Sequence, residues 1–477
     1  MIVNISLIPL FLGGLSLILN RHKRITIGLT FVSMLLSVLI LVLNLGKNFE
    51  TVIGDWGALG ISIGYDEIAL PFLLAVVVVL FAVFMNSLHK NYDGFFYALI
   101  TLLLGSLNAV FITRDLFNVY VSFELASIIG FILIAYGRKG RQIWATLKYM
   151  LISALGFNFY LIGIGLVYMR SGTFSFSAMD NMDKLPAMLI FVGLSVKSGL
   201  FLLSMWLPDA HANAVTEISP ILSGLMVKIE DYLVIRFLQY GSFEWLRGVY
   251  LIVGSISAVA GVIFAMNARK AKDILAYHTF SQIGFIIAAS NIAAAWHAFS
   301  HAVFKGLLFM TAGNIYERLG TQKVEEWNEK ISRKEYIPLL VGSAAIIGAP
   351  LTSGFVTKNE IMDSIIGPAK YLLVIASVGT VISFAKFVFV RTSKEKVKLS
   401  WNSQLASMIM IFTIFAHGIL GFDSHHVLDA LVMITAGIPL YFVLKRFFKP
   451  LPKTFERLDN ALLIYLVFFA VMVTFII

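Results

Sequence analysis

Ionisable side chains interrupt the long apolar segments of this sequence. Lys197 stands near the middle of PAMLIFVGLSVKSGLFLLSMWLPD, which runs from Pro186 to Asp209. A lysine at the centre of a membrane-spanning helix costs about 2.5–3.5 kcal/mol on insertion scales. Similar interruptions occur at Glu124, Lys228, His297, His301, Lys305 and Lys358. Costly groups repeated in this way favour a protein that moves charge.

Glu124 and Lys197 are a candidate charge switch. Glu124 lies midway between Asp115 and Arg138, so it is expected near the bilayer centre. A buried carboxylate and a buried amine that meet stabilise each other's charged forms, and each drifts towards neutrality when they separate. A moving charge nearby could therefore drive a proton on or off Lys197. A static ion pair is the alternative interpretation.

Lys228 and the histidines extend the set. Asp231 lies three residues after Lys228, within reach on the same helical face, so this pair also has a structural interpretation. His297, His301 and Lys305 are four residues apart and form one polar stripe on a helix. Histidine accepts and donates protons near neutral pH, so the stripe predicts a proton relay. It lacks a third ligand, and no metal is expected.

Several neighbouring residues are candidate modulators of these charges. Lys272 and Asp273 precede His278, which favours a structural or peripheral position for this histidine near the cytoplasmic start of its helix. Lys358 could instead extend its amine towards the outer face. The candidate modulators are Asp115, His211, Glu230, Asp231, His278 and Glu360.

The composition is that of an integral membrane protein. The chain has 477 residues, of which 59% are hydrophobic and 13% charged, and its mean hydropathy is +0.87. Cysteine is absent, which excludes thiolate-bound metals, iron–sulfur clusters and disulfides. The net charge of +10 does not indicate nucleic acid, because the basic residues lie in short loops. No cofactor is expected.

The apolar segments predict an all-α polytopic fold. Their lengths suit about 14–16 transmembrane helices, the first of them at the N-terminus in place of a cleaved signal sequence. The predicted spans are 2–20, 25–45, 67–88, 94–113, 115–136, 146–168, 186–206, 219–237, 247–267, 273–290, 293–316, 336–364, 366–390, 403–420, 427–444 and 460–477.

Basic residues fall in alternate loops. The loops around Arg21, Arg138, Arg269, Lys396 and Lys445 are basic, whereas 46–65 and GFDSHHVLD are poor in lysine and arginine. The positive-inside rule then places the basic loops in the cytoplasm and both termini outside the plasma membrane.

Two segments are predicted to be broken helices. WLPDAHANAVTEISP contains Pro208 and Pro220, and GAPLTSGF at 348–355 contains Pro350 between glycines. Irregular backbone at membrane depth survives only inside protein or beside a wet cavity. Paired breaks are typical of inverted-repeat transporters.

These motifs resemble a known family. They are similar to the antiporter-like subunits of respiratory complex I, Mrp cation/proton antiporters and membrane-bound hydrogenases. The motifs that carry the resemblance are a glutamate in one span, a lysine followed by WLPDAH, LAYHTFSQIG at 275–284, the histidine stripe and GAPLTSGFVTK at 348–358. The resemblance implies two inverted five-helix repeats. It suggests N-terminal helices at 1–90, repeats at 91–240 and 241–390, and C-terminal helices at 391–477.

The resemblance also assigns roles. Glu124 and Lys197 become the carboxylate–lysine pair, Lys228 the central lysine, the stripe a connecting relay, and Lys358 the terminal lysine. The chain departs from the family pattern at Val215, Pro220, Ser300 and after Lys228, where Glu230 and Asp231 could hold that lysine protonated.

The sequence therefore predicts a subunit that translocates protons, or Na⁺ and protons, in a redox-driven complex. It would hold no redox centre itself, and its partners would be other membrane subunits, a peripheral redox arm and lipid. The alternatives are a Mrp-type Na⁺/H⁺ antiporter subunit without a redox partner, and a structural membrane spacer.

Overall fold

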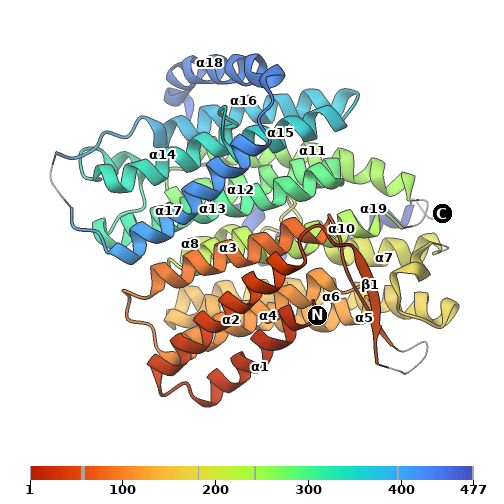
Figure 1. The fold of residues 1–477 in the computed structure, drawn as a ribbon. Helices are drawn as coiled ribbons and strands as arrows, with labels where there is room; N and C mark the ends of the chain where they lie inside the picture. Colours follow the sequence, from red (N-terminus) through yellow and green to blue (C-terminus); the bar gives the residue numbers. More distant parts are fainter. Residues whose placement is uncertain (1, 55–59, 181, 241–242, 395–396, 475–477) are drawn as a thin grey trace.

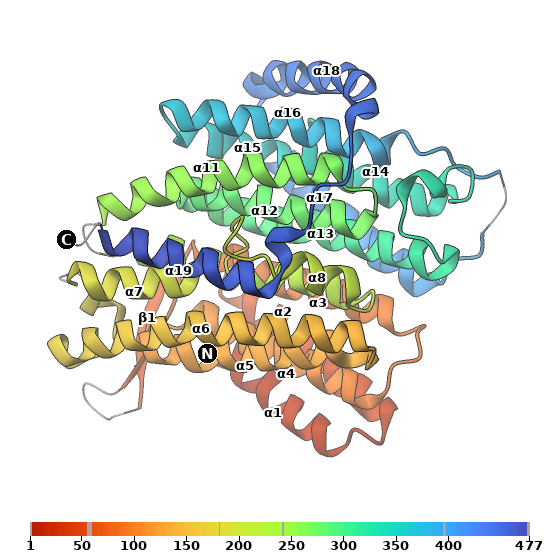
Figure 2. The ribbon, with the colours of Figure 1, turned by 180° about the vertical axis from the view of Figure 1, so that it is seen from behind.

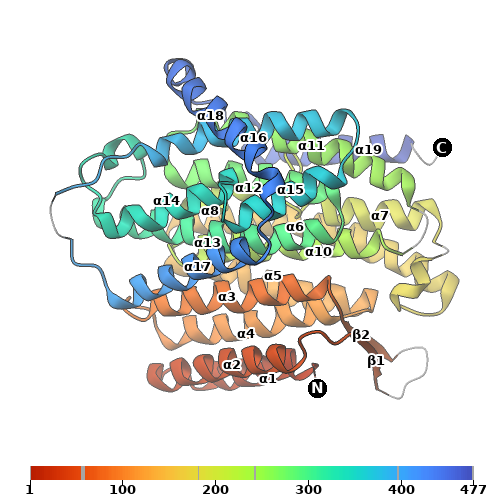
Figure 3. The ribbon, with the colours of Figure 1, turned by 45° about the horizontal axis from the view of Figure 1, so that its top comes forward.

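The protein is a bundle of long, roughly parallel helices (Figure 1). The computed structural model describes residues 2–54, 60–180, 182–240, 243–394 and 397–474. Lys396 of the predicted basic loop and positions 475–477 of the last predicted span lie outside these residues. Helices α1 and α2 form one edge of the bundle, and α18 stands at the opposite edge (Figures 1 and 3).

The helices follow the apolar segments closely. The N-terminal part comprises α1 (Asn4–Ile18), α2 (Lys23–Leu43), α3 (Ala69–Ser87), α4 (Gly94–Ile112), α5 (Leu116–Ile134), α6 (Gly140–Ser171), α7 (Lys184–Ser195), α8 (Leu207–Asn213), α9 (Ile218–Ile221) and α10 (Lys228–Phe237). The remainder comprises α11 (Glu244–Asn267), α12 (Ala271–Ala289), α13 (Ile292–Leu319), α14 (Arg333–Ile347), α15 (Ser353–Ser364), α16 (Pro368–Val388), α17 (Trp401–Leu420), α18 (Val427–Leu444) and α19 (Leu458–Thr474).

The fold is that of a polytopic membrane protein. Among the described residues, 9 helices are long and apolar enough to cross a membrane. Helices α12 and α13 are also long, but they carry the charged and histidine residues picked out from the sequence. Helix α13 lies at the centre, packed against α3, α9, α12, α14, α15 and α17. Its polar stripe is therefore enclosed by protein.

Close helix packing depends on small residues. A side chain built on Gly284 of α12 would come within 2.5 Å of the backbone of Ala258 and Gly254 on α11. Such contact between backbones is common where membrane helices associate, because lipid offers no hydrophobic drive for association. Helices α11 and α12 are thereby held face to face along their length.

The first broken region begins before Pro208, with an interruption that the prolines did not predict. Helix α7 ends at Ser195, and residues 196–206 form turns in which Gly199 and Leu202 have φ values of +76° and +68°. The predicted interruption of WLPDAHANAVTEISP is present at 214–217, between α8 and α9, although Pro208 itself stands in the first turn of α8, where a proline needs no amide partner. Lys197 lies inside the break at 196–206.

The second break matches its prediction. Helix α14 ends at Ile347 and α15 begins at Ser353. Between them Gly348 and Leu351 adopt φ values of +83° and +68°. Both breaks therefore separate a helix into two parts beside a buried lysine.

Two features of the fold were not predicted from the sequence: a β-hairpin and the path of the chain to its last helix. The 46–65 loop contains an antiparallel hairpin of β1 (Phe49–Ile53) and β2 (Ile61–Tyr65). At the other end of the chain, a connection leads from α18 to α19, which packs on α7 (Figure 2). Phe469 of α19 lies 4.7 Å from Phe159 of α6 between ring centroids. The chain thus returns from the far edge to the first half of the bundle.

Candidate functional site

Lys197 is held in an aromatic and hydroxyl environment. Its side chain is 1% exposed, and its amine donates a 2.7 Å hydrogen bond to Ser127 Oγ on α5. The amine also lies 3.8 Å from the ring centroid of Phe157 and 4.0 Å from that of Phe123. Ring faces attract a cation, so the protonated lysine is stabilised without an adjacent carboxylate.

Glu124 stands on the same helix as Ser127, three residues earlier. Among the described residues no ion pair joins it to Lys197, although the charges of Glu230 and Glu124 both act on that amine. Glu124 is only partly buried, and its neighbours Val121 and Leu125 are exposed. Its carboxylate therefore lies between the interior and the outer surface of the bundle.

Lys228 forms a buried ion pair. Its amine lies 2.6 Å from Asp231 Oδ2, and both side chains are buried, as the spacing predicts. Glu230 is also buried, and its Oε2 has no partner among the described residues. A π-helical turn at Leu222–Met226 precedes Lys228. Such turns are frequent at functional sites because they re-aim the side chains that follow.

His297 connects three helices. Its Nδ1 lies 2.8 Å from Thr357 Oγ1 on α15, and its Nε2 lies 3.2 Å from Gln282 Oε1 on α12. Thr357 directly precedes Lys358 in the chain. The histidine therefore joins the relay stripe to the helix that carries the terminal lysine.

The rest of the stripe is equally enclosed. His301 is completely buried, and neither of its ring nitrogens has a hydrogen-bond partner among the described residues. The charges of Lys228 and Lys305 both act on His301. The amine of Lys305 donates to the backbone carbonyl of Leu275 on α12 and lies 4.8 Å from the centroid of the Phe309 ring.

Lys358 is buried beside the second break. It is 5% exposed, so it does not extend its amine to the outer surface, the alternative weighed from the sequence. Its amine donates a 2.6 Å hydrogen bond to the carbonyl of Ile346 near the end of α14. Carbonyl groups at a helix C-terminus lack partners within the helix and favour a cation.

The candidate modulators occupy different environments. Asp115 caps α5 by accepting a 2.6 Å hydrogen bond from the Asn118 amide, and Glu360 is exposed. His211 is buried and stacks on Phe309 at 4.6 Å between centroids. His278 is completely buried beside Phe384, so it does not lie at the periphery of the bundle, and its structural role stays a prediction.

The polar residues form separate groups. The first joins Lys197 to Ser127, the second joins Lys228 to Asp231, and the third joins His297 to Thr357 beside Lys358. In the part of the chain that the structure describes, no hydrogen bond links one group to the next. Protons crossing these gaps would need water or side-chain motion.

Sequence reasoning did not identify Ser127, Gln282 and Thr357, whose only signal is a polar side chain in an apolar helix.

A bundle with buried lysines at two helix breaks belongs to the class of antiporter-like membrane subunits. The family model described as NADH:quinone oxidoreductase/Mrp antiporter, transmembrane, matches residues 113–383. Because this match covers more than half of the chain, the protein belongs to that family.

Similar proteins come from antiporters and from respiratory enzymes. A component of the Na⁺/H⁺ antiporter of Alkalihalophilus pseudofirmus is 26% identical over 74% of this chain and 78% of its own length. A component of the NADH-quinone oxidoreductase of Desulforudis audaxviator is 29% identical over 62% of this chain and 64% of its own length. A protein of the Mrp complex from a Dietzia species has the same fold, with a TM-score of 0.82, 18% identity and coverage of 97% and 99%.

Proposed function

We propose that this chain translocates protons, or exchanges protons for Na⁺, as one subunit of a redox-driven membrane complex. The observation that carries the proposal is the pair of helix breaks, each with a lysine that is 1% or 5% exposed. Ionisable groups at membrane depth are costly and are found mainly on ion pathways. Broken helices in both halves of a transporter are typical of its ion-binding region. Residues 91–240 and 241–390 would be the inverted repeats.

The proposed pathway begins at Glu124 and ends at Lys358. Electron transfer in a neighbouring subunit would move a charge near Glu124, whose partial exposure leaves it accessible to such a partner. Lys197 would then gain or lose its proton. The change would pass through Lys228 and the stripe of His297, His301 and Lys305 to Lys358. Water would bridge the gaps between the groups.

The complex is proposed to lie in the plasma membrane. The alternate basic loops favour a cytoplasmic location for those loops and an outside location for both termini. The electron carriers would belong to a peripheral arm, because this chain contains no cysteine for an iron–sulfur cluster.

A Mrp-type Na⁺/H⁺ antiporter without redox partners is the second candidate. The observation that favours it is the similarity to the Na⁺/H⁺ antiporter component of Alkalihalophilus pseudofirmus, which extends over 74% of the chain. The same lysines and histidines would then couple inward movement of protons to outward movement of Na⁺.

Purification of the intact complex distinguishes these functions. The chain should be tagged in its native cells and extracted in mild detergent, and its partners should be identified by mass spectrometry. Subunits that bind flavin or iron–sulfur clusters would support the redox-driven complex. Small hydrophobic subunits alone would support the antiporter. A chain that purifies without any partner would contradict both.

A further inference from the structure

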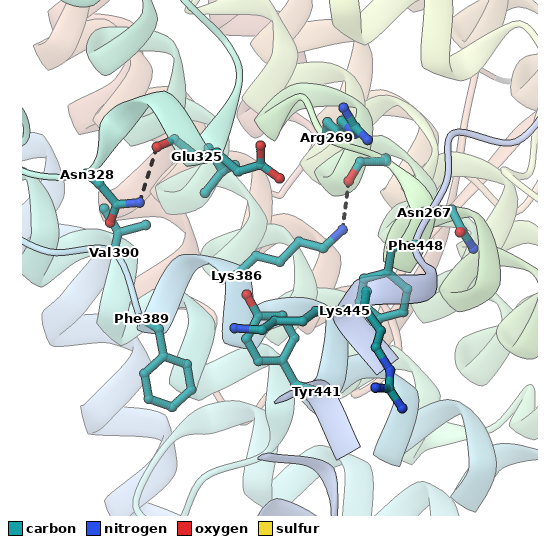
Figure 4. Close-up of a pocket in the computed structure, with 13 residues that line it drawn as sticks. Asn267, Arg269, Glu325, Asn328, Lys386, Phe389, Val390, Tyr441, Lys445 and Phe448 are labelled. Atoms are coloured by element: carbon teal, nitrogen blue, oxygen red, sulfur yellow. Dashed lines mark hydrogen bonds between the residues drawn. The ribbon is translucent and has the colours of Figure 1, made fainter. Parts of the chain in front are cut away.

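A basic cavity lies where three apolar helices end. Its volume is about 400 Å³, and its lining includes residues beside the C-terminal ends of α11, α16 and α18 (Figure 4). All three helices are long and apolar enough to span a membrane. The cavity therefore lies at the boundary between the apolar layer and the headgroups of the lipids.

Cations predominate in this cavity. Arg269, Lys386, Lys445 and Arg446 line it, and Glu325 is the acidic residue among its lining side chains. Among the described residues, Arg269, Lys445 and Arg446 form no ion pair with a carboxylate, whereas other basic residues of the bundle do. The cavity thus carries positive charge that the protein itself does not neutralise.

Lys386 fixes the floor of the cavity. Its amine donates a 2.5 Å hydrogen bond to the carbonyl group of Met266 at the end of α11. It donates a second one, of 2.7 Å, to the carbonyl group of Ala268 (Figure 4). It also lies 5.2 Å from the centroid of the Phe448 ring. These contacts hold one cation in place, so the more exposed cations at the rim are the ones free to bind a ligand.

Aromatic side chains line the wall between the cations and the apolar layer. Phe389 and Tyr441 stack nearly parallel, with 6.2 Å between ring centroids. The amine of Lys445 lies 5.9 Å from the centroid of the Tyr441 ring. Aromatic rings and long basic side chains are typical of the membrane interface, where they contact tails on one side and headgroups on the other.

Lipid can reach the cavity from the side. Helix α18 packs on α16 and stands away from the rest of the bundle (Figure 3). Its outward residues are exposed, with Leu428 at 70%, Val432 at 57% and Val443 at 54%. Apolar side chains exposed to this extent on a membrane helix suit contact with acyl chains, which would bring a headgroup to the cavity at the end of the helix.

We propose that this cavity binds the phosphate of an anionic phospholipid headgroup. Arg269, Lys445 and Arg446 would contact the phosphate, and the acyl chains would lie along α16 and α18. Basic pockets between membrane helices on the basic side of a protein suit such headgroups. This binding site is separate from the proposed proton pathway, and it would anchor α18 to the bundle.

Native mass spectrometry of the purified complex tests this proposal. Phosphatidylglycerol, phosphatidylcholine or inorganic phosphate would be added to the wild-type complex and to the variant R269Q/K445Q/R446Q. The control variant R21Q/K23Q/R24Q removes the same charge from another basic loop. Each basic residue near an anionic headgroup strengthens binding about fivefold, so the single variant R269Q should bind phosphatidylglycerol about fivefold more weakly and the triple variant more weakly still.

The outcomes separate a lipid from a free anion. The proposal expects tighter binding of phosphatidylglycerol than of phosphatidylcholine, loss of this preference in the triple variant, and no change in the control. Equal binding of phosphatidylglycerol by R269Q and the wild type would overturn it. Displacement of the lipid by an equal concentration of inorganic phosphate would also overturn it, because the cavity would then be a site for the free ion. If the triple variant does not assemble, R269Q decides the result.

Discussion

The amine of Lys358 donates a 2.6 Å hydrogen bond to the carbonyl of Ile346 across the break between α14 and α15. At the other break, Lys197 donates to a hydroxyl group, Ser127 Oγ, on a different helix. The two lysines therefore have different partners. A change in the protonation of Lys358 would act directly on the end of a broken helix, whereas a change at Lys197 would act on α5, the helix that carries Glu124.

Variants of the buried Lys228–Asp231 pair can distinguish an effect on stability from an effect on transport. Lys228→Met leaves the Asp231 carboxylate without its partner, and removal of one member of a buried ion pair costs about 3–5 kcal/mol. The double variant K228M/D231L should recover most of that stability. Thermal unfolding of the purified complex measures both. We expect neither variant to transport protons, and normal transport by the double variant would exclude Lys228 from the pathway.

Thr357→Val should slow transport without loss of the assembled protein. The substitution conserves shape but removes the hydroxyl group that bonds His297. A buried polar group left without its partner costs about 1–3 kcal/mol, which corresponds to roughly a 5- to 150-fold change in rate if the bond is needed for proton transfer. Thr380→Val is the matched control, because within the described residues Thr380 Oγ1 bonds only the carbonyl of Ala376 in its own helix. Equal rates in the two variants would contradict a role for Thr357.

His301→Ala should interrupt the relay. His301 is the middle group of the stripe, and proton transfer by a positioned side chain contributes about 100-fold or more to a rate. Proton uptake by vesicles that contain the reconstituted complex provides the measurement. His425→Ala is the control, since His425 is exposed in the loop before α18. A His301→Ala complex with the rate of this control would rule out the relay.

Cysteine labelling tests the orientation in this cysteine-free chain. Lys398 lies in the predicted cytoplasmic loop between α16 and α17, and His425 is exposed in a predicted outer loop. A membrane-impermeant thiol reagent should label H425C but not K398C in intact cells. Labelling of K398C from outside would show that the predicted orientation is inverted.

Hydrophobicity predicted the helices but not the exact place of the first break. Segment 186–206 reads as one apolar span, yet α7 ends at Ser195. The break is stabilised by bonds within the segment and to another helix, because Ser204 Oγ donates to the carbonyl of Val196 and the Phe201 amide donates to Ser257 Oγ on α11. Leu202 has φ +68°, a conformation that leucine rarely adopts. Tertiary contacts of this kind leave no local pattern.

Charge and spacing predicted the cations of the candidate site and the Lys228–Asp231 pair, but not the hydroxyl partners of Lys197 and His297. A lysine in an apolar segment is conspicuous because of its cost. A hydroxyl group in such a segment is not conspicuous, since most hydroxyl groups bond the carbonyl four residues earlier in their own helix. Ser127 and Thr357 do this as well, bonding Phe123 and Ser353. Their further contacts with Lys197 and His297 depend on which helices meet.

Proton transport by Glu124→Gln and Lys197→Ala complexes tests the central claim most directly. Both variants should be purified with their partners, reconstituted into vesicles and compared with the wild type at matched protein content. The account predicts assembled complexes that have lost coupled ion transport, because the two residues switch charge. A purely structural role for the two residues predicts loss of the assembled protein instead. Full transport by either assembled variant would contradict the proposed pathway.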